Sequence, residues 1–176
     1  WRQKADGNRR FTQVYDEKGR KGGKSQYAGG IELYCGLCEG EESAEVYTAA
    51  TTRDQADMVF RAVKKMGRYL RQDSPLMAKA ITVMAHSVIL NNTDSFIQKV
   101  SADAGTLDGL NPHCAVIDEY HAHKNDGVKG VMQTGMGSRE NPLLFIITTA
   151  GFDKEAPCYK VERANAVEVL RGNRKQ

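Results

Sequence analysis

Four consecutive residues, Gly22-Gly23-Lys24-Ser25, have the types and spacing of a phosphate-binding loop. In the pattern G-x-x-x-x-G-K-[ST], successive backbone N–H groups cradle phosphates, the lysine reaches the β- and γ-phosphates, and the Ser or Thr hydroxyl holds Mg²⁺. The first glycine of the pattern is replaced by Lys18. A surface turn of glycines and basic residues looks similar, so the prediction depends on the strands and acidic residues that follow.

A pair of carboxylates, Asp118 and Glu119, follows the short apolar segment Cys114–Ile117. An apolar strand of a parallel sheet that ends in Asp-Glu places both carboxylates at the carboxyl edge, where a ligand of the phosphate loop would lie. There the Asp would hold Mg²⁺ and the Glu would polarise an attacking water. One alternative is that the pair only ends a strand and caps a helix. Another is a metal cluster with His121 and His123, although we favour histidines that orient the loop near the phosphates.

Two threonines, Thr148 and Thr149, follow a second fully apolar segment, Leu143–Ile147. If this strand lies beside the Asp-Glu strand, both hydroxyls are placed to sense the γ-phosphate or its water. Simple strand termination explains the same residues. Arg139, just before this strand, is a candidate arginine for acting on the nucleotide of a neighbouring subunit.

Two elements must position the phosphate loop. After Ser25, apolar residues recur at the spacing of one helical face, which predicts a helix that begins at Lys24-Ser25. The recurring residues are Tyr27, Ile31, Tyr34, Cys35 and Cys38. Residues 10 to 18 must include the strand that feeds the loop, but Asp16, Glu17 and Lys18 are poor residues for a strand buried on both faces.

Further elements follow from apolar periodicity and turn signals. Residues 45 to 50 are expected to form a strand, a helix begins near Arg53, and the sequence Ser74-Pro75 ends it. Residues 81–90 and 95–100 are expected to form a hairpin-like pair of strands, and a last helix runs from Pro157 to Leu170. The polar loop 101–112 is of the kind that carries function on a rigid scaffold.

Length and composition fit one α/β domain, with 176 residues of which 40% are hydrophobic. The net charge of +3 is compatible with a polyanionic partner but does not require one. We expect a soluble cytoplasmic protein, because the sequence has neither a signal peptide nor an apolar run of about 20 residues. Cys35 and Cys38 have zinc or redox spacing without a second ligand pair, so structural thiols are expected.

Taken together, five motifs resemble the ATPase domain of the large terminase subunit of tailed bacteriophages. The motifs are Arg20-Lys-Gly-Gly-Lys-Ser25, Ala50-Thr-Thr-Arg-Asp-Gln-Ala56, Thr106-Leu-Asp-Gly-Leu-Asn-Pro-His113, Val116-Ile-Asp-Glu-Tyr-His-Ala-His123 and Ile147-Thr-Thr-Ala-Gly151. The resemblance covers essentially the whole chain, and this family tolerates a loop without the first glycine. The expected fold is an α/β P-loop NTPase with a mainly parallel central sheet flanked by helices, plus a short antiparallel excursion near residues 81–100.

The resemblance also implies residue roles. Lys24 and the loop amides would bind the phosphates of ATP, Ser25 and Asp118 would hold Mg²⁺, and Glu119 would be the catalytic carboxylate assisted by Asp118. Thr148 and Thr149 would couple hydrolysis to movement on DNA, and Arg20 would contact phosphate from inside the loop. The nucleotide-binding set is Arg20, Lys21, Gly22, Gly23, Lys24, Ser25 and Gln26.

At the level of the whole protein, the resemblance implies an Mg-dependent ATPase that drives double-stranded viral DNA into a procapsid. Expected partners are DNA, the portal and the small terminase subunit, in a homo-oligomeric ring without membrane contact, in the host cytoplasm at the procapsid vertex. Residues 1–176 would be one ATPase domain of a longer protein, with an adenine-binding segment before it and a nuclease domain after it. The alternatives are a helicase-like nucleic-acid-dependent ATPase and a non-catalytic nucleotide- or DNA-binding module.

Overall fold

The computed structural model describes residues 3–101, 107 and 109–174. Within this part of the chain, seven strands form one sheet in the order β1-β7-β6-β2-β5-β4-β3. The strands are β1 (Gln13–Glu17), β2 (Glu45–Ala50), β3 (Ile81–Val83), β4 (Ser87–Leu90), β5 (Ser95–Ser101), β6 (Pro112–Asp118) and β7 (Leu143–Thr148). The helices are α1 (Lys24–Cys38), α2 (Arg53–Asp73), α3 (Pro75–Ala80), α4 (Gly127–Gly135) and α5 (Ala164–Leu170), with the short helical turns η1 (Tyr120–Ala122), η2 (Met136–Ser138) and η3 (Cys158–Arg163).

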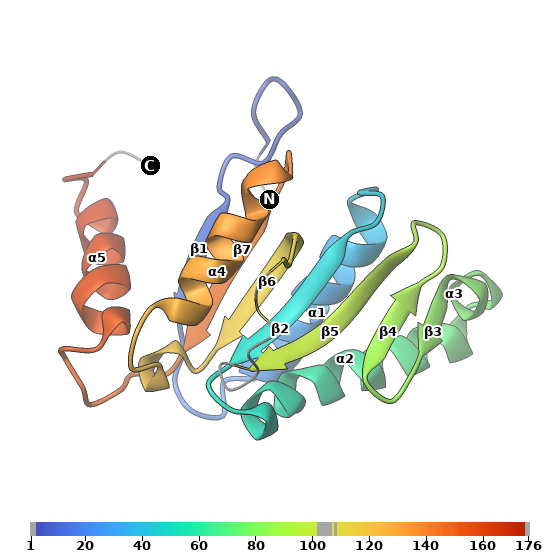
Figure 1. Ribbon diagram of the computed structural model, residues 1–176, viewed down its shortest axis with the longest axis horizontal. Coiled ribbons are helices and arrows are strands. Elements are labelled where there is room, and N and C mark those ends of the chain that lie inside the picture. Colours follow the sequence, from blue (N-terminus) through green and yellow to red (C-terminus); the bar gives the residue numbers. More distant parts are fainter. Residues whose placement is uncertain (1–2, 102–106, 108, 175–176) are drawn as a thin grey trace.

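The strands β1, β7, β6, β2 and β5 are parallel to one another. The sheet continues with two antiparallel pairs, β5 with β4 and β4 with β3. Figure 1 shows the parallel strands ending at the lower edge, where the loop before α1 also lies. The expected mainly parallel sheet with an antiparallel excursion is therefore confirmed. The excursion differs in detail, because the predicted strand 81–90 is interrupted by a turn at residues 84–86 and forms two short strands, β3 and β4.

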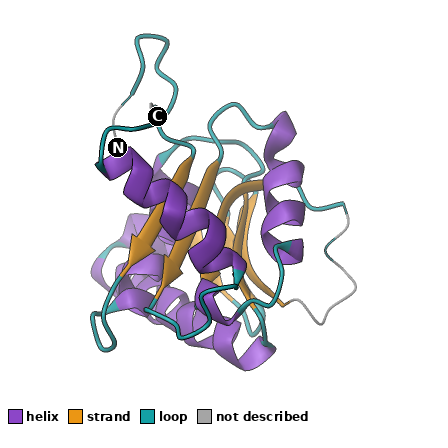
Figure 2. Ribbon diagram, turned by 90° about the vertical axis from the view of Figure 1, so that its left-hand side faces the viewer, coloured by secondary structure: helices purple, strands orange, loops and turns teal. Residues whose placement is uncertain are grey.

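Helices cover both faces of the sheet (Figure 2). Strand β6 is buried along its whole length, and successive side chains point to opposite faces of the sheet. Cys114 and Val116 pack in the cluster that contains residues of α1 and α2, while Ala115 and Ile117 pack in the cluster that contains residues of α4 and η1. The hydrophobic core therefore lies on both sides of the strand that ends at Asp118.

Strand β1 lies at the edge of the sheet and pairs only with β7 among the described strands. Its residues are exposed or half-buried. This position explains how the polar residues Asp16 and Glu17 are accommodated, because an edge strand need not be buried on both faces. Lys18 forms an ion pair with Asp16 at 3.1 Å and lies over the ring of Tyr27.

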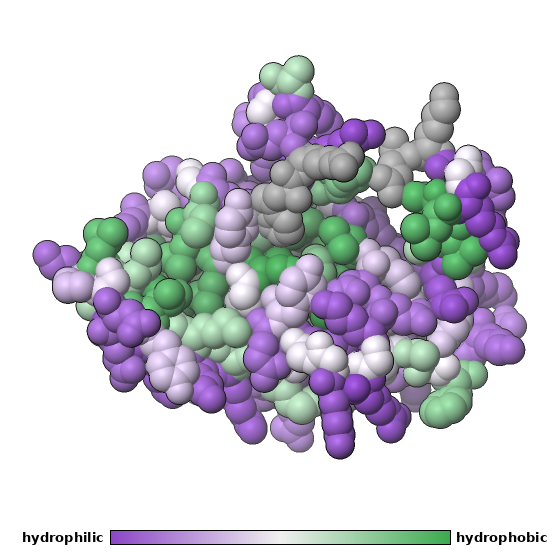
Figure 3. Space-filling view, turned by 180° about the vertical axis from the view of Figure 1, so that it is seen from behind, coloured by the Kyte–Doolittle hydropathy of each residue, from purple (hydrophilic) through white to green (hydrophobic). Residues whose placement is uncertain are grey.

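Helix α1 begins at Lys24 as predicted, but its buried face differs from the predicted one. Ile31 and Cys35 are buried, whereas Tyr27, Tyr34 and Cys38 are exposed. The packing role predicted for Cys38 is thus wrong, because α1 ends there and leaves the thiol at the surface. Figure 3 views this side of the molecule and shows hydrophilic side chains along its lower margin, with hydrophobic ones nearer the middle. None of the helices in the described residues is both long and apolar enough to cross a membrane.

One carboxyl group, that of Glu32 in α1, is completely buried in the core. The hydroxyl of Thr48 in β2 donates to both of its oxygens, at 2.7 and 2.9 Å. Burial, which outweighs the Thr48 hydrogen bond, raises the pKa of Glu32 from 4.5 to about 8, and nearby Asp118 adds to the rise. Burial therefore favours the protonated form of Glu32 in the folded chain.

Replacing Glu32 with Gln tests this protonation state. A carboxyl with a raised pKa stabilises the folded chain fully below its unfolded-state value, and this contribution is lost as the pH rises through the folded-state value. Relative to the wild type, Glu32→Gln should therefore gain roughly 2–4 kcal/mol in free energy of unfolding between pH 4.5 and pH 8. Urea unfolding at both pH values measures this gain. The exposed Glu140→Gln serves as control, and an equal effect of Glu32→Gln at both pH values would contradict the assignment.

Candidate nucleotide site

The loop before α1 leaves backbone N–H groups available to an anion. Gly23 has a left-handed φ of 70°, which a glycine adopts without strain, and it stands at the N-cap position of α1. Among the described residues, no side chain caps this helix end, and its first turn contains no acidic residue. The N–H groups of the first turn therefore point into the space in front of the helix, which is the arrangement that binds phosphate.

This space is a pocket of about 600 Å³ at the carboxyl edge of the sheet. It brings together the whole predicted loop, Arg20 to Gln26, with Asp118, Glu119 and Thr149. His121 from η1 also lines it, as expected of a histidine near the phosphates, together with two residues that the sequence did not indicate, Gln55 and Met58 from the start of α2. Thr148, the residue before Thr149, is fully buried.

Neighbouring strand ends bring these groups together. β7 lies between β1 and β6, and its register pairs Thr148 with Glu17 and Ile147 with Asp118. The backbone N–H of Lys18 extends this ladder by donating to the carbonyl of Thr148 at 3.0 Å. The loop, the carboxylates and the threonines therefore start from almost the same level of the sheet.

Lys24 and Glu119 form an ion pair across the pocket, with 2.8 Å between Nζ and Oε1. The second oxygen of Glu119, Oε2, accepts a hydrogen bond from the hydroxyl of Thr149 at 3.1 Å. Burial alone would raise the pKa of Glu119, but the Lys24 ammonium and the Thr149 hydroxyl outweigh it and hold the pKa below its usual value. Glu119 is therefore an ionised carboxylate that is held on both oxygens.

Asp118 is electrostatically different from its neighbour. Its side chain is nearly inaccessible, and burial together with the charge of Glu119 raises its pKa to about 6. One oxygen, Oδ1, accepts the backbone N–H of Glu119 at 2.8 Å. Glu119 itself has a left-handed backbone (φ 48°), which turns the chain sharply away from the end of β6.

Oxygen donors near the loop fit Mg²⁺ chemically. The Ser25 hydroxyl and the Asp118 carboxylate line the same pocket, and hard oxygen ligands are those that Mg²⁺ prefers, together with water and phosphate. Nowhere in the described residues is a group of three His, Cys, Asp or Glu placed to hold a metal ion, so neither the zinc nor the histidine-cluster alternative gains support. His123 is buried beside the ring of Tyr120.

Two predicted features remain outside this group. Arg139 precedes β7 at the opposite edge of the sheet, where its guanidinium donates to Glu41 and to the backbone of Ser43 and Asn111. Its action on a neighbouring subunit stays a prediction, and these contacts do not favour it. The loop 101–112 and the motif Thr106–His113 fall partly on residues 102–106 and 108, which lie outside the described residues.

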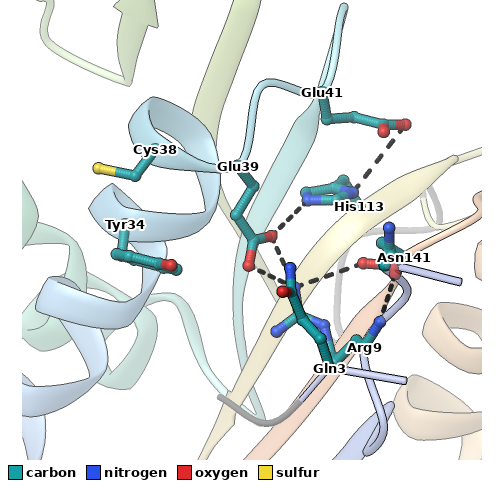
Figure 4. A pocket seen from close by; sticks show the side chains of 9 residues that line it. Gln3, Arg9, Tyr34, Cys38, Glu39, Glu41, His113 and Asn141 are labelled. Carbon is teal, nitrogen blue, oxygen red and sulfur yellow. Dashed lines mark hydrogen bonds and ion pairs between the residues drawn. The ribbon is translucent and has the colours of Figure 1, made fainter. Parts of the chain in front are cut away.

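A smaller pocket of about 180 Å³ lies at the amino edge of the sheet (Figure 4). Glu39, just after α1, contacts the Arg9 guanidinium at 2.5 Å and Nε2 of His113 at 2.7 Å. Arg9 also donates its backbone N–H to Asn141 at 2.7 Å. These charges compensate each other within the chain, so we assign this pocket a structural role in joining α1 to the starts of β6 and β7.

The sequence of the chain is similar to those of known proteins. A family model described as "Terminase large subunit, ATPase domain" matches residues 1–166. The chain is 52% identical over 66 residues to Protein YmfN of Escherichia coli K12, covering 38% of this chain and 14% of that protein. It is 27% identical over 135 residues to the large terminase subunit of Enterobacteria phage HK97, covering 74% of this chain and 26% of that protein. The chain thus spans about a quarter or less of the length of these relatives.

Solved structures show the same fold. The large terminase of bacteriophage HK97 matches with a TM-score of 0.78 at 24% identity, over 94% of this chain and 34% of that chain. The large terminase of the thermophilic bacteriophage D6E matches with a TM-score of 0.67 at 11% identity, over 89% of this chain and 38% of that chain.

The ion pair across the pocket makes a prediction about carboxyl pKa values. Replacing Lys24 with Met removes the ammonium that lowers the pKa of both Glu119 and Asp118, so both values should rise. An NMR titration of the side-chain carboxyl carbons measures them. Lys154→Met, which changes an exposed lysine elsewhere, should leave both values unchanged. Unaltered pKa values in Lys24→Met would show that the ion pair does not form in solution.

Proposed function

Since the chain belongs to the family of terminase large subunit ATPase domains, we propose that it binds and hydrolyses Mg-ATP. Within a terminase large subunit, this hydrolysis would drive double-stranded DNA into a procapsid. The observation that carries the proposal is the single pocket that gathers the loop from Arg20 to Gln26, both carboxylates and Thr149. Family membership favours this function over a helicase-like ATPase. The presence of Asp118 and Glu119 in the pocket supports turnover rather than simple nucleotide binding.

Phosphate binding falls to the loop and the start of α1. The free N–H groups of the first turn, the ammonium of Lys24 and the guanidinium of Arg20 supply positive charge on one side of the pocket. The ammonium of Lys24 is occupied by Glu119 in the structure. Binding of triphosphate must therefore compete for Lys24, and this competition would release Oε1 of Glu119.

Glu119 is suited to orient the attacking water. Its depressed pKa keeps it ionised, and the Thr149 hydroxyl still holds Oε2 once Lys24 has moved to the phosphates. Ser25 and Asp118 would hold Mg²⁺, which would neutralise charge on the phosphates. Thr148 and Thr149 end the strand between the loop strand and the carboxylate strand, a position that supports a role in passing the nucleotide state to the rest of the protein.

Whole-protein roles belong to the same proposal. The longer protein would contain this domain with an adenine-binding segment and a nuclease domain, and it would act as a ring on the portal with the small terminase subunit. It would work in the host cytoplasm at the procapsid vertex. To act between subunits, Arg139 would have to leave its contacts with Glu41 and with the carbonyl of Ser43, which hold its guanidinium within the chain.

Two substitutions test the proposed chemistry. Glu119→Gln keeps the shape of the side chain but removes its charge, so it should lower kcat roughly 10²- to 10⁴-fold. Nucleotide binding should be as tight as in the wild type or tighter, because Gln competes less well for Lys24. Lys24→Ala should lower kcat and also weaken nucleotide binding. Phosphate release and fluorescent-nucleotide titration measure the two effects, with the exposed Glu140→Gln and Lys154→Ala as controls. Unchanged ATP hydrolysis in both test variants would refute the assignment. In the longer motor protein, each of the two substitutions should abolish DNA packaging.

Removal of Mg²⁺ tests the proposed metal ligands. Chelation with EDTA should abolish hydrolysis, and Asp118→Asn should raise the Mg²⁺ concentration needed for half-maximal rate, because it removes a charged oxygen ligand. Hydrolysis that persists at full rate in EDTA would remove Ser25 and Asp118 as metal ligands.

A further inference from the structure

His121 touches both the carboxylate and the threonine pair of the nucleotide site. It lies in η1, two residues after Glu119, and its side chain is about a quarter exposed to the pocket. Its ring nitrogen Nδ1 is 3.1 Å from Oε2 of Glu119 and 3.0 Å from the hydroxyl oxygen of Thr148. Its backbone N–H also donates to that hydroxyl, at 3.1 Å. One residue therefore bridges the ends of β6 and β7.

The direction of these hydrogen bonds follows from counting protons. The hydroxyl of Thr148 donates to the carbonyl of Thr149 at 3.1 Å, so its oxygen can only accept from His121. Nδ1 of His121 must then carry a proton, which it shares between Thr148 and the ionised Oε2 of Glu119. Oε2 receives its second hydrogen bond from Thr149. His121 and Thr149 thus hold the oxygen that Lys24 does not contact.

Gly151 allows His121 to occupy this place. A Cβ atom built on Gly151 would lie 2.8 Å from Cβ of His121 and 3.0 Å from its ring, both closer than side chains tolerate. The glycine that closes the segment Ile147–Gly151 therefore has a steric reason, since any side chain there would push His121 away from Glu119 and Thr148.

We infer that His121 is a positioning residue that links the catalytic carboxylate to the end of β7, so that Glu119 and the Thr148-Thr149 pair move as one unit. This inference rests on the proposed function. When phosphate takes Lys24 away from Glu119, His121 and Thr149 keep the carboxylate in place. A shift of Glu119 during turnover is passed to β7 through the same imidazole.

Kinetics of matched His121 variants test the positioning role. Asn places an N–H donor near the position of Nδ1, whereas Ala has none. His121→Ala should lower kcat roughly tenfold to hundredfold with little change in KM for ATP, because the phosphate loop is untouched. His121→Asn should recover most of kcat. His86→Ala, an exposed histidine in the turn between β3 and β4, is the control. Full kcat in His121→Ala, or no recovery in His121→Asn, would overturn the inference.

Gly151→Ala provides a test that leaves His121 itself unchanged. The added methyl should displace the imidazole and reproduce the kcat loss of His121→Ala. Gly130→Ala, where a Cβ meets nothing within 4 Å, should have no effect. Wild-type kcat in Gly151→Ala would count against the link.

A stability cycle tests the link without any need for hydrolysis. His121→Ala, Thr148→Val and the double variant are compared by thermal unfolding. Because both single changes break the same contact, the fall in Tm of the double variant should be smaller than the sum of the two single falls. Additive falls would overturn the link. An inactive wild-type chain with a non-additive cycle would instead refute the proposed function and retain the link.

Discussion

The register between β1, β7 and β6 is the constraint on which the site depends. Parallel pairing aligns the end of β1 with Thr148 and places Asp118 beside Ile147, so three chain segments leave the sheet at one level. A slip of one residue in either pair would turn every side chain of the strand to the other face. It would bury the wrong carboxylate and separate Lys24 from Glu119. The two-sided burial of β6 and β7 fixes this register, because all of their residues are buried and their apolar side chains pack in the core on both faces of the sheet.

Much of this arrangement could be predicted from the sequence, because its signals are local. The loop residues, the start of α1 at Lys24 and the apolar strands before Asp118 and Thr148 each follow from adjacent residues. The order of the strands does not, since pairing joins segments that are distant in the sequence, as where β1 pairs with β7 more than a hundred positions later. The sequence alone does not show that β1 lies at the edge of the sheet, so Asp16 and Glu17 argue against a strand buried on both faces. They are accommodated because β1 is an edge strand.

Other parts of the site could not be predicted for related reasons. Gln55 and Met58 reach the pocket only because α2 begins beside it, and nothing in their types signals a ligand. His121 had a signal in its short distance from Glu119, but its contacts with Thr148 depend on the pairing of β6 with β7. The exposed face of α1 was misassigned at Cys38, because apolar spacing does not show where a helix extends beyond the sheet.

The ion pairs at the two edges of the sheet differ in how far they are exposed to solvent. At the amino edge, the Arg9–Glu39 pair is more enclosed, with side-chain exposures of 8% and 12%, and its charges are used in holding the fold together. At the carboxyl edge, the Lys24–Glu119 pair has exposures of 11% and 22% and lines an open pocket. A ligand can replace one partner of the second pair at lower cost, because water reaches the group that is released.

The left-handed backbone at Glu119 has an evolutionary consequence. A non-glycine residue in this conformation costs about 1–2 kcal/mol relative to an ordinary one. A glycine at this position would relieve that strain but would remove the carboxylate. Selection for stability alone would therefore favour loss of the proposed catalytic carboxylate, and a consensus sequence designed for stability would need Glu119 held fixed.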